Sequence, residues 1–113
     1  MPDRTVESAE LRRLRRRIDA LDRRIVGLLS ERAELAREVG RAKRAVGRRA
    51  IRDSGREREV LLRVTMANTG PLPQADLLAL YRRLMAATRA LESRDRATKD
   101  VRIRIAERTD STD

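Results

Sequence analysis

With 113 residues and a mass of 13.0 kDa, the chain is long enough for one domain and too short for two. Aromatic residues make up 1% of it, and it has five glycines, three prolines, no Cys and no His. This composition favours helices with an aliphatic core. It excludes disulfides, thiol nucleophiles, histidine-based catalysis and zinc sites, and no cofactor is predicted. Without an apolar run near the roughly 20 residues of a membrane span, or an apolar signal segment, a soluble cytoplasmic protein is predicted.

The chain carries a net charge of +10, and of its 28 basic residues only Lys43 and Lys99 are lysines. A basic helical protein can bind nucleic acid by neutralising phosphates. Arginines can also hold a small anionic ligand, because the planar guanidinium matches the two oxygens of a carboxylate. A third interpretation is that a GC-rich genome favours arginine over lysine on the surface. Charge alone does not decide among these three.

Residues 1–8 are polar and are predicted to form a flexible lead. After them, apolar residues recur in steps of three and four, which predicts one amphipathic helix over about residues 7–45. At about 1.5 Å per residue this helix would be nearly 60 Å long, more than a globule of this size is wide. It therefore needs a second chain to cover its apolar stripe, which predicts a homodimer. The stripe consists of Leu11, Leu14, Ile18, Leu21, Ile25, Leu28, Leu35, Val39, Ala42 and Val46.

A loop follows over residues 45–53. The next four residues have the form of a capping box, with Ser54 as the N-cap and Glu57 three positions later. They predict a second helix over about residues 55–67.

The segment 68–73, which contains Gly70 and two prolines, predicts a turn. A third helix is predicted from Gln74 to a point between Ser93 and Ala97. Residues 94–113 are left as a tail of uncertain structure, in which residues 101–105 alternate like a strand that has no pairing partner. The predicted fold is all-α, with three helices per chain.

Two cations interrupt the apolar stripe of the first helix. Arg32 stands between Leu28 and Leu35, and Lys43, about three turns later, points the same way. Either both side chains extend past the edge of the core into solvent, or they line an anion pocket. Arg15 points at least a quarter-turn away from them, so it can serve such a pocket only on a partner chain, and a solvated surface is its simpler interpretation.

Further polar residues fall on inward-facing positions. Thr88 interrupts the stripe of the third helix, and Glu92 follows one turn later. Each has a structural explanation, since Thr88 can bond to its own helix and Glu92 can pair with an arginine. Glu57 is explained by the capping box, and Asp53 and Arg56 by a solvated helix start. Their convergence on one side of the predicted helices favours a site.

Three runs of sequence carry a resemblance to a known family. The first is the helix from Leu14 to Lys43, with LRRRIDALD, LLSERAEL and VGRAK in order; the second is IRDSGRE, residues 51–57; the third is YRRLMAATRALE, residues 81–92. Over residues 9–93 the chain resembles the all-helical class of chorismate mutases. The resemblance implies one such domain over these residues, in an intertwined homodimer whose two pockets each borrow one arginine from the other subunit.

The resemblance also implies roles for single residues. Lys43 and Glu92 would be catalytic, acting on the breaking ether bond, and Glu92 stands where many members have Gln. Thr88 stands where the family usually has Ser. The implied substrate-binding set, which surrounds a dicarboxylate, is Arg15 of the partner subunit with Arg32, Lys43, Asp53, Arg56, Glu57, Thr88 and Glu92, Asp53 acting mainly through its backbone.

The implied reaction converts chorismate to prephenate in aromatic amino-acid biosynthesis. This intramolecular rearrangement needs a restrained conformer and stabilised charge, but no acid–base step, so it suits a chain without His or Cys. The same fold also supports a 4-amino-4-deoxychorismate mutase or an isochorismate pyruvate lyase, and both stay open. An activating enzyme of the shikimate pathway is a further candidate partner. A nonenzymatic nucleic-acid-binding dimer is disfavoured, because the chain lacks an aromatic platform and a helix-turn-helix signal.

Overall fold

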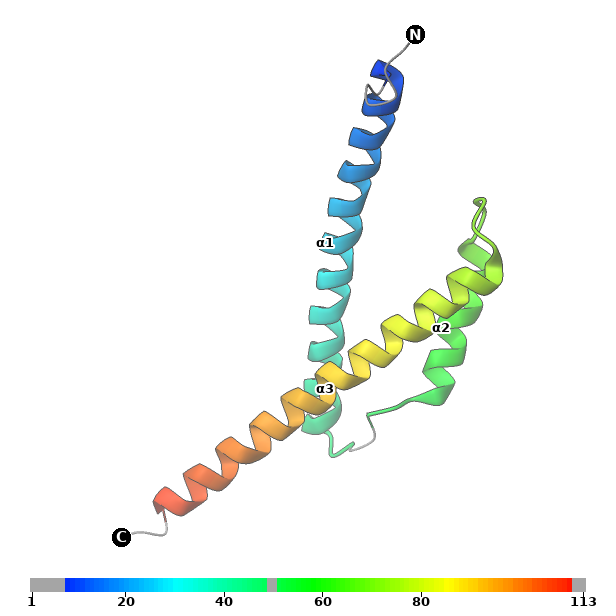
Figure 1. Cartoon of the computed structure of the whole chain (residues 1–113). Helices are drawn as coiled ribbons and strands as arrows, with labels where there is room; N and C mark the ends of the chain where they lie inside the picture. The colour runs from blue at the N-terminus through cyan, green and yellow to red at the C-terminus, as the bar shows by residue number, and fades with distance from the viewer. Residues whose placement is uncertain (1–7, 49–50, 111–113) are drawn as a thin grey trace. The chain divides into compact units, whose positions relative to one another are not determined.

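The computed structural model describes residues 8–48 and 51–110 (Figure 1). These residues form three helices, α1 over Ala9–Ala45, α2 over Ser54–Ala67 and α3 over Gln74–Asp110, and no strand. The prediction of an all-α fold with a long first helix is confirmed. None of the helices in the described ranges combines the length and apolar character that a membrane span requires. The expected flexible lead, apart from Ser8, lies outside the described residues.

The chain divides into two compact units, residues 1–35 and residues 36–113. In the first unit the described structure is the N-terminal part of α1, which begins where the Ser8 hydroxyl oxygen accepts a hydrogen bond from the Leu11 N–H, at 3.1 Å. Its apolar stripe is exposed, with Ile18 55% and Leu28 61% accessible to solvent. Because exposed aliphatic surface of this extent costs free energy in water, the stripe is suited to cover by another helix.

The second unit contains a helical hairpin. α2 and α3 pack against each other, and Figure 1 shows α2 alongside the N-terminal half of α3. Leu61 and Val64 of α2 and Leu84 of α3 are half-buried, and Met85 is 6% exposed. In the turn between them the Asn68 side-chain amide donates to the Leu72 carbonyl, at 3.1 Å. This hairpin holds the N-terminus of α2 against the middle of α3.

The third helix is longer than the sequence predicts. The expected end between Ser93 and Ala97 is wrong, since α3 continues to Asp110. The alternating residues 101–105 have no strand partner within the described chain, and no glycine or proline follows Pro73 to stop the helix. The helix-forming residues around this segment therefore extend α3. In the extension the Thr98 hydroxyl donates to the Arg94 carbonyl and the Thr109 hydroxyl to the Ile105 carbonyl, at 3.0 Å each.

Candidate functional site

α1 ends in a tight turn. Three cations, Lys43, Arg44 and Arg48, lie in the last turn of the helix and in this turn. Gly47 adopts a φ of 78°, which favours glycine. Its N–H donates to the Arg44 carbonyl at 3.0 Å, and the Arg48 N–H donates to the Lys43 carbonyl at 2.8 Å. These two bonds form a Schellman motif, which satisfies the last carbonyls of the helix. The turn reverses the chain and brings Arg48 back to the end of α1.

α2 is capped by Asp53, not by the predicted cap Ser54. The Asp53 Oδ1 atom accepts a hydrogen bond from the Arg56 N–H, at 3.0 Å, so Asp53 is the N-cap and Ser54 is the first helical residue. Aspartate caps as well as serine does, and the helix starts one residue earlier than expected. The Arg56 N–H bond, assisted by the charges of Lys43 and Arg48, lowers the pKa of Asp53 despite some desolvation. Lys43 is therefore within electrostatic range of the Asp53 carboxylate, and Arg48 pairs with it at 3.9 Å.

Glu57 does not complete a capping box. Its two carboxylate oxygens instead accept from one nitrogen of Arg89, at 2.5 and 2.6 Å. Both side chains are largely buried, with 18% of Glu57 and 29% of Arg89 exposed. The pair ties the start of α2 to α3. Arg89 was missed by the sequence analysis, because nothing in the pattern distinguishes it from the other arginines of that helix.

A second ion pair ties the end of α1 to α3. Arg37 donates to both oxygens of Asp95, from Nε at 2.8 Å and from a terminal nitrogen at 3.0 Å. The hydrogen bond from Arg37 lowers the pKa of Asp95, against the effect of desolvation. Two parallel bonds of this kind fix orientation as well as distance. The last turns of α1 thus hold a defined register on α3.

Glu92 lies at the place where α1 passes close to α3. Gly40 is buried, and a Cβ atom on it would lie 3.7 Å from the Glu92 Cγ and 3.7 Å from a terminal nitrogen of Arg44. A methyl group at Gly40 would just touch the Glu92 side chain, whereas a longer side chain there would compete with it for space. Within the described residues, the Glu92 carboxyl makes neither a hydrogen bond nor an ion pair.

Burial raises the pKa of Glu92 above its ordinary value. The positive charges of Lys43, Arg44 and Arg96 oppose this shift, and the negative charge of Asp95 adds to it. The upward direction means that burial shifts the equilibrium of Glu92 toward the neutral carboxylic acid. Lys43 is within electrostatic range of the Glu92 carboxyl group, and the neutral form of that group would be a hydrogen-bond donor like Lys43.

The other predicted site residues are placed as follows. Thr88 lies one turn before Glu92 and is half-buried, but its hydroxyl donates to the Leu84 carbonyl at 3.0 Å, as its structural explanation expected. Arg56 is exposed and pairs with Glu59 at 3.4 Å. Arg15, exposed, and Arg32, half-buried, both lie on α1 within residues 1–35, the other unit. Lys43 thus lies within electrostatic range of both Asp53 and Glu92, whereas Arg15 and Arg32 belong to the other unit.

The half-buried Glu92 carboxyl lies in a mostly cationic environment. These positive charges attract negative charge, burial favours the neutral form of the carboxyl group, and the chain has no histidine or thiol for acid–base or nucleophilic chemistry. The described residues thus form an all-helical fold with a cluster of cations around one carboxyl group.

The family model of chorismate mutase type II matches residues 14–93. The chain belongs to this family and carries a chorismate mutase type II domain, which confirms the resemblance seen in the sequence.

Individual relatives agree. A solved structure of chorismate mutase (form II) from Thermus thermophilus is similar with a TM-score of 0.71 and 35% identity, over 75% of this chain and 96% of that one. The bifunctional chorismate mutase/prephenate dehydratase of Stutzerimonas stutzeri is 41% identical over 90 residues, which are 76% of this chain and 25% of that protein. The Aquifex aeolicus protein of the same name is 36% identical over 89 residues, 75% of this chain and 24% of that one. The chain spans about a quarter of the length of these two bifunctional relatives.

Gly40 offers a direct test of the α1–α3 approach. A methyl group fits there at ordinary contact distance, so Gly40→Ala is expected to raise the free energy of unfolding by about 0.5–1 kcal/mol through helix propensity. Gly40→Leu is expected to displace the Glu92 side chain and to lower both stability and turnover. Thermal unfolding and steady-state kinetics measure these effects.

Gly27→Ala is the matched control, because Gly27 lies on the same helix with nothing within 4 Å of the added Cβ. It should show the propensity gain alone. A Gly40→Leu protein with unchanged kcat would contradict the positioning of Glu92 by this contact.

Proposed function

We propose that the chain is a chorismate mutase, which rearranges chorismate to prephenate in aromatic amino-acid biosynthesis. The observation that carries this proposal is that the half-buried Glu92, on α3, experiences the positive charge of Lys43, on α1, while burial raises its pKa. Membership of the chorismate mutase type II family supports the choice of substrate. The enzyme is then an isomerase, and its substrate is a small dicarboxylate.

The proposed mechanism needs only binding and charge stabilisation. The extended substrate is held in a compact conformer, so that the carbons that form the new bond meet. Negative charge develops on the ether oxygen as its bond breaks, and Lys43 and protonated Glu92 donate hydrogen bonds to it. Each preorganised donor of this kind contributes on the order of 2–4 kcal/mol to the transition state.

The substrate carboxylates need further cations. We assign Arg32 to the pocket of its own chain and Arg15 to the pocket of a partner subunit, in a homodimer with two shared sites. The exposed apolar stripe of α1 supports a partner chain, because it includes large aliphatic side chains such as Ile25 at 52% and Leu35 at 56% exposure. Asp53, Arg56, Glu57 and Thr88 complete the proposed substrate-binding set.

Glu57 and Thr88 would take up their substrate contacts from the positions already described. The Glu57 carboxylate still has lone pairs that do not face Arg89, and these would accept a hydrogen bond from a ring hydroxyl. The Thr88 hydroxyl donates to Leu84 and still has an acceptor site, or rotates to donate to a carboxylate.

A dimer that does not persist as a folded monomer is the expected solution state. The stripe of α1 would otherwise remain exposed, and its burial supplies much of the free energy of folding. Sedimentation equilibrium with circular dichroism should show a helical dimer at micromolar concentration and loss of helicity on dilution. A stable helical monomer at that concentration would contradict the shared pockets.

Two related compounds are alternative substrates for a protein of this fold. We expect the purified protein to consume chorismate with a kcat/KM at least tenfold above those for isochorismate and 4-amino-4-deoxychorismate, measured side by side by absorbance. Lys43→Ala should reduce the rate for chorismate by about a hundredfold or more, since it removes a donor to the ether oxygen. Equal rates for wild type and Lys43→Ala would reveal a contaminating enzyme and refute the assignment.

An activating enzyme of the same pathway remains a proposed partner, and a cytoplasmic location remains a prediction from the sequence.

A further inference from the structure

A half-open cavity lies where the end of α1 meets the C-terminal half of α3. Its volume is about 330 Å³, and it is lined by Arg44, Gly47, Arg48, Arg96, Lys99, Asp100 and Ile103. All of these residues belong to one compact unit, residues 36–113. The cavity is at the small end of the range for ligand pockets, which suits a compact ligand. None of its lining residues belongs to the substrate-binding set proposed above.

The lining is strongly cationic. Four basic side chains, Arg44, Arg48, Arg96 and Lys99, face the cavity with one acidic residue, Asp100. Cations near the C-terminus of α1 gain some stabilisation from the helix dipole, which accounts for the presence of Arg44 and Arg48. It does not account for two further cations supplied by α3. Like charges gathered in one hollow repel one another, so the arrangement favours an anion among them.

Arg44 supplies an independent observation. Its Nε atom is buried and has no hydrogen-bond partner among the described residues. A buried donor without an acceptor is unfavourable, and such donors are rare in folded proteins. One terminal nitrogen of the same guanidinium lies against Gly40, so the group is held in place by packing. This guanidinium contributes to the wall of the cationic cavity, and an anion bound there would satisfy the buried Nε–H after a small movement of the Arg44 side chain.

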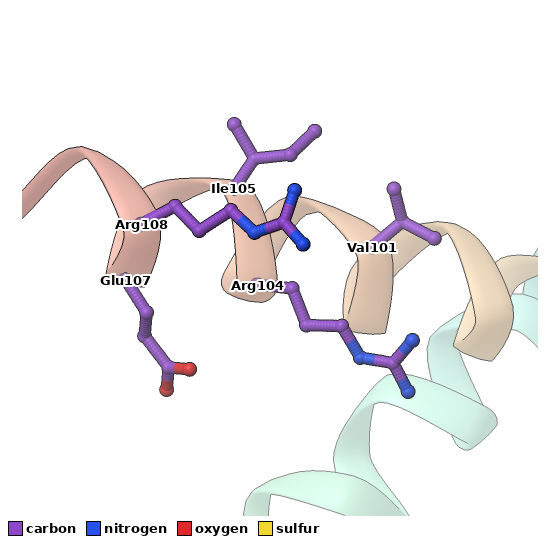
Figure 2. A pocket seen from close by; sticks show the side chains of 5 residues that line it. All are labelled: Val101, Arg104, Ile105, Glu107 and Arg108. Atoms are coloured by element: carbon purple, nitrogen blue, oxygen red, sulfur yellow. The ribbon is translucent and has the colours of Figure 1, made fainter.

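A larger hollow on α3 lacks these features. It encloses about 560 Å³ and is lined by Val101, Arg104, Ile105, Glu107 and Arg108 (Figure 2). All five side chains come from one stretch of helix, and Figure 2 shows Val101 and Ile105 pointing to one side and Glu107 to the other. No second element supplies an opposite wall. The smaller cavity has walls from several elements, because the end of α1, the turn at Gly47 and α3 all contribute to it.

We propose that the cavity lined by Arg44, Arg48, Arg96 and Lys99 is a second anion-binding site, which takes a small multivalent oxyanion bearing phosphate or carboxylate groups. The planar guanidinium of Arg44 would hold two oxygens of the anion. Arg48, on the reversed chain after Gly47, and Lys99, on α3, would add charge. Binding there does not depend on the proposed mutase activity, because the test below measures no turnover.

Isothermal titration with inorganic phosphate tests the site, with sodium chloride at matched ionic strength as the reference. Wild type is expected to bind phosphate saturably at one site per chain. The double variant Arg48→Gln/Lys99→Gln should lose at least tenfold in affinity. The double variant Arg82→Gln/Arg83→Gln, which removes the same charge from exposed positions of α3 outside the cavity, should stay within about twofold of wild type.

Two outcomes of this titration would overturn the proposal. One is an equal loss in both double variants, since binding would then reflect net charge alone. The other is the absence of saturable binding by wild type. The variant Arg32→Gln distinguishes this site from the substrate pocket. It should bind phosphate as wild type does, because Arg32 does not line the cavity. If Arg32→Gln loses phosphate binding, the anion binds to the substrate-pocket cations instead, and the proposal is refuted. Titration with malonate shows whether phosphate or carboxylate oxygens bind more tightly.

A charge-conserving exchange tests the role of the Arg44 guanidinium. Arg44→Lys keeps the charge but removes the buried Nε–H, and it should weaken phosphate binding at least fivefold. Lys99→Arg keeps the charge at a position where we assign no particular geometry, and it should change affinity less than twofold. Circular dichroism would establish that both variants are folded. Equal affinities in the two variants would overturn the assignment of Arg44 as the anion ligand.

Discussion

Replacing Arg15 or Arg32 with alanine is expected to lower kcat/KM for chorismate by at least about a hundredfold, since each removes a charge-assisted anchor for a substrate carboxylate. Both residues lie on α1, and alanine is the strongest helix former. Helicity and dimerisation should therefore be retained. Circular dichroism and sedimentation on the same samples check this, so that lost activity can be attributed to the missing cation.

The proposed exchange of Arg15 between subunits makes a sharper prediction. In a heterodimer with Arg15→Ala on one chain and Arg32→Ala on the other, one pocket carries both lesions and the other carries neither. After complete exchange of equal amounts, about a quarter of wild-type activity should return, because half of the dimers are mixed and each has one intact pocket. Arg13→Ala, an exposed neighbour on the same helix, is the matched control and should neither lose activity nor rescue Arg32→Ala beyond its own rate. No recovery after demonstrated exchange would refute the role of Arg15 in the partner's pocket.

Glu92→Gln is expected to abolish the pH dependence of turnover. Only the neutral acid form of Glu92 can donate to the ether oxygen, and the charged form would repel the negative charge that develops there. Burial raises the pKa of Glu92, against the positive charges of Lys43, Arg44 and Arg96. Because the protonated fraction grows as pH falls toward this pKa, kcat of the wild type should rise from mildly alkaline to mildly acidic pH, until another group or the fold fails.

The glutamine variant keeps a donor at every pH, so its profile should be flat and its kcat at neutral pH should exceed that of wild type. The buffers should contain no phosphate or polycarboxylate, since Arg44 and Arg96 line the proposed anion cavity. Thermal unfolding at each pH separates loss of turnover from loss of fold. Parallel profiles for the two proteins would show that Glu92 is not the donor and that the third run of the family resemblance is misaligned.

The sequence predicts those parts of the fold that depend on local periodicity. The stripe of α1 sets its length to within two residues, because steps of three and four over ten turns have no other interpretation. The end of α3 was missed because residues 101–105 alternate in hydrophobicity, and only the absence of a pairing strand decides between strand and helix. Asp53 and Ser54 are both good caps, and local sequence does not choose between neighbours.

Some residues of the candidate site can likewise be predicted from the sequence, and others cannot. Lys43 and Glu92 are polar residues at inward-facing positions of their helices, and the family resemblance implies their roles; in the structure the charge of Lys43 acts on Glu92. Gly40 and Arg89 gave no such signal. Their roles depend on contacts between helices, Gly40 with Glu92 and Arg89 with Glu57, which helical periodicity does not encode. The cavity at the end of α1 likewise combines cations that stand far apart in the sequence.

Identification of the product by proton NMR tests the central claim most directly. Chorismate is incubated with the purified chain alone, in a buffer free of phosphate, and spectra are followed until the substrate is consumed. The account predicts that prephenate accumulates in equal amount to the chorismate lost, that no pyruvate is released, and that Lys43→Ala leaves the chorismate signals unchanged over the same time. Release of pyruvate, or persistence of chorismate with the folded dimer at micromolar concentration, would contradict it.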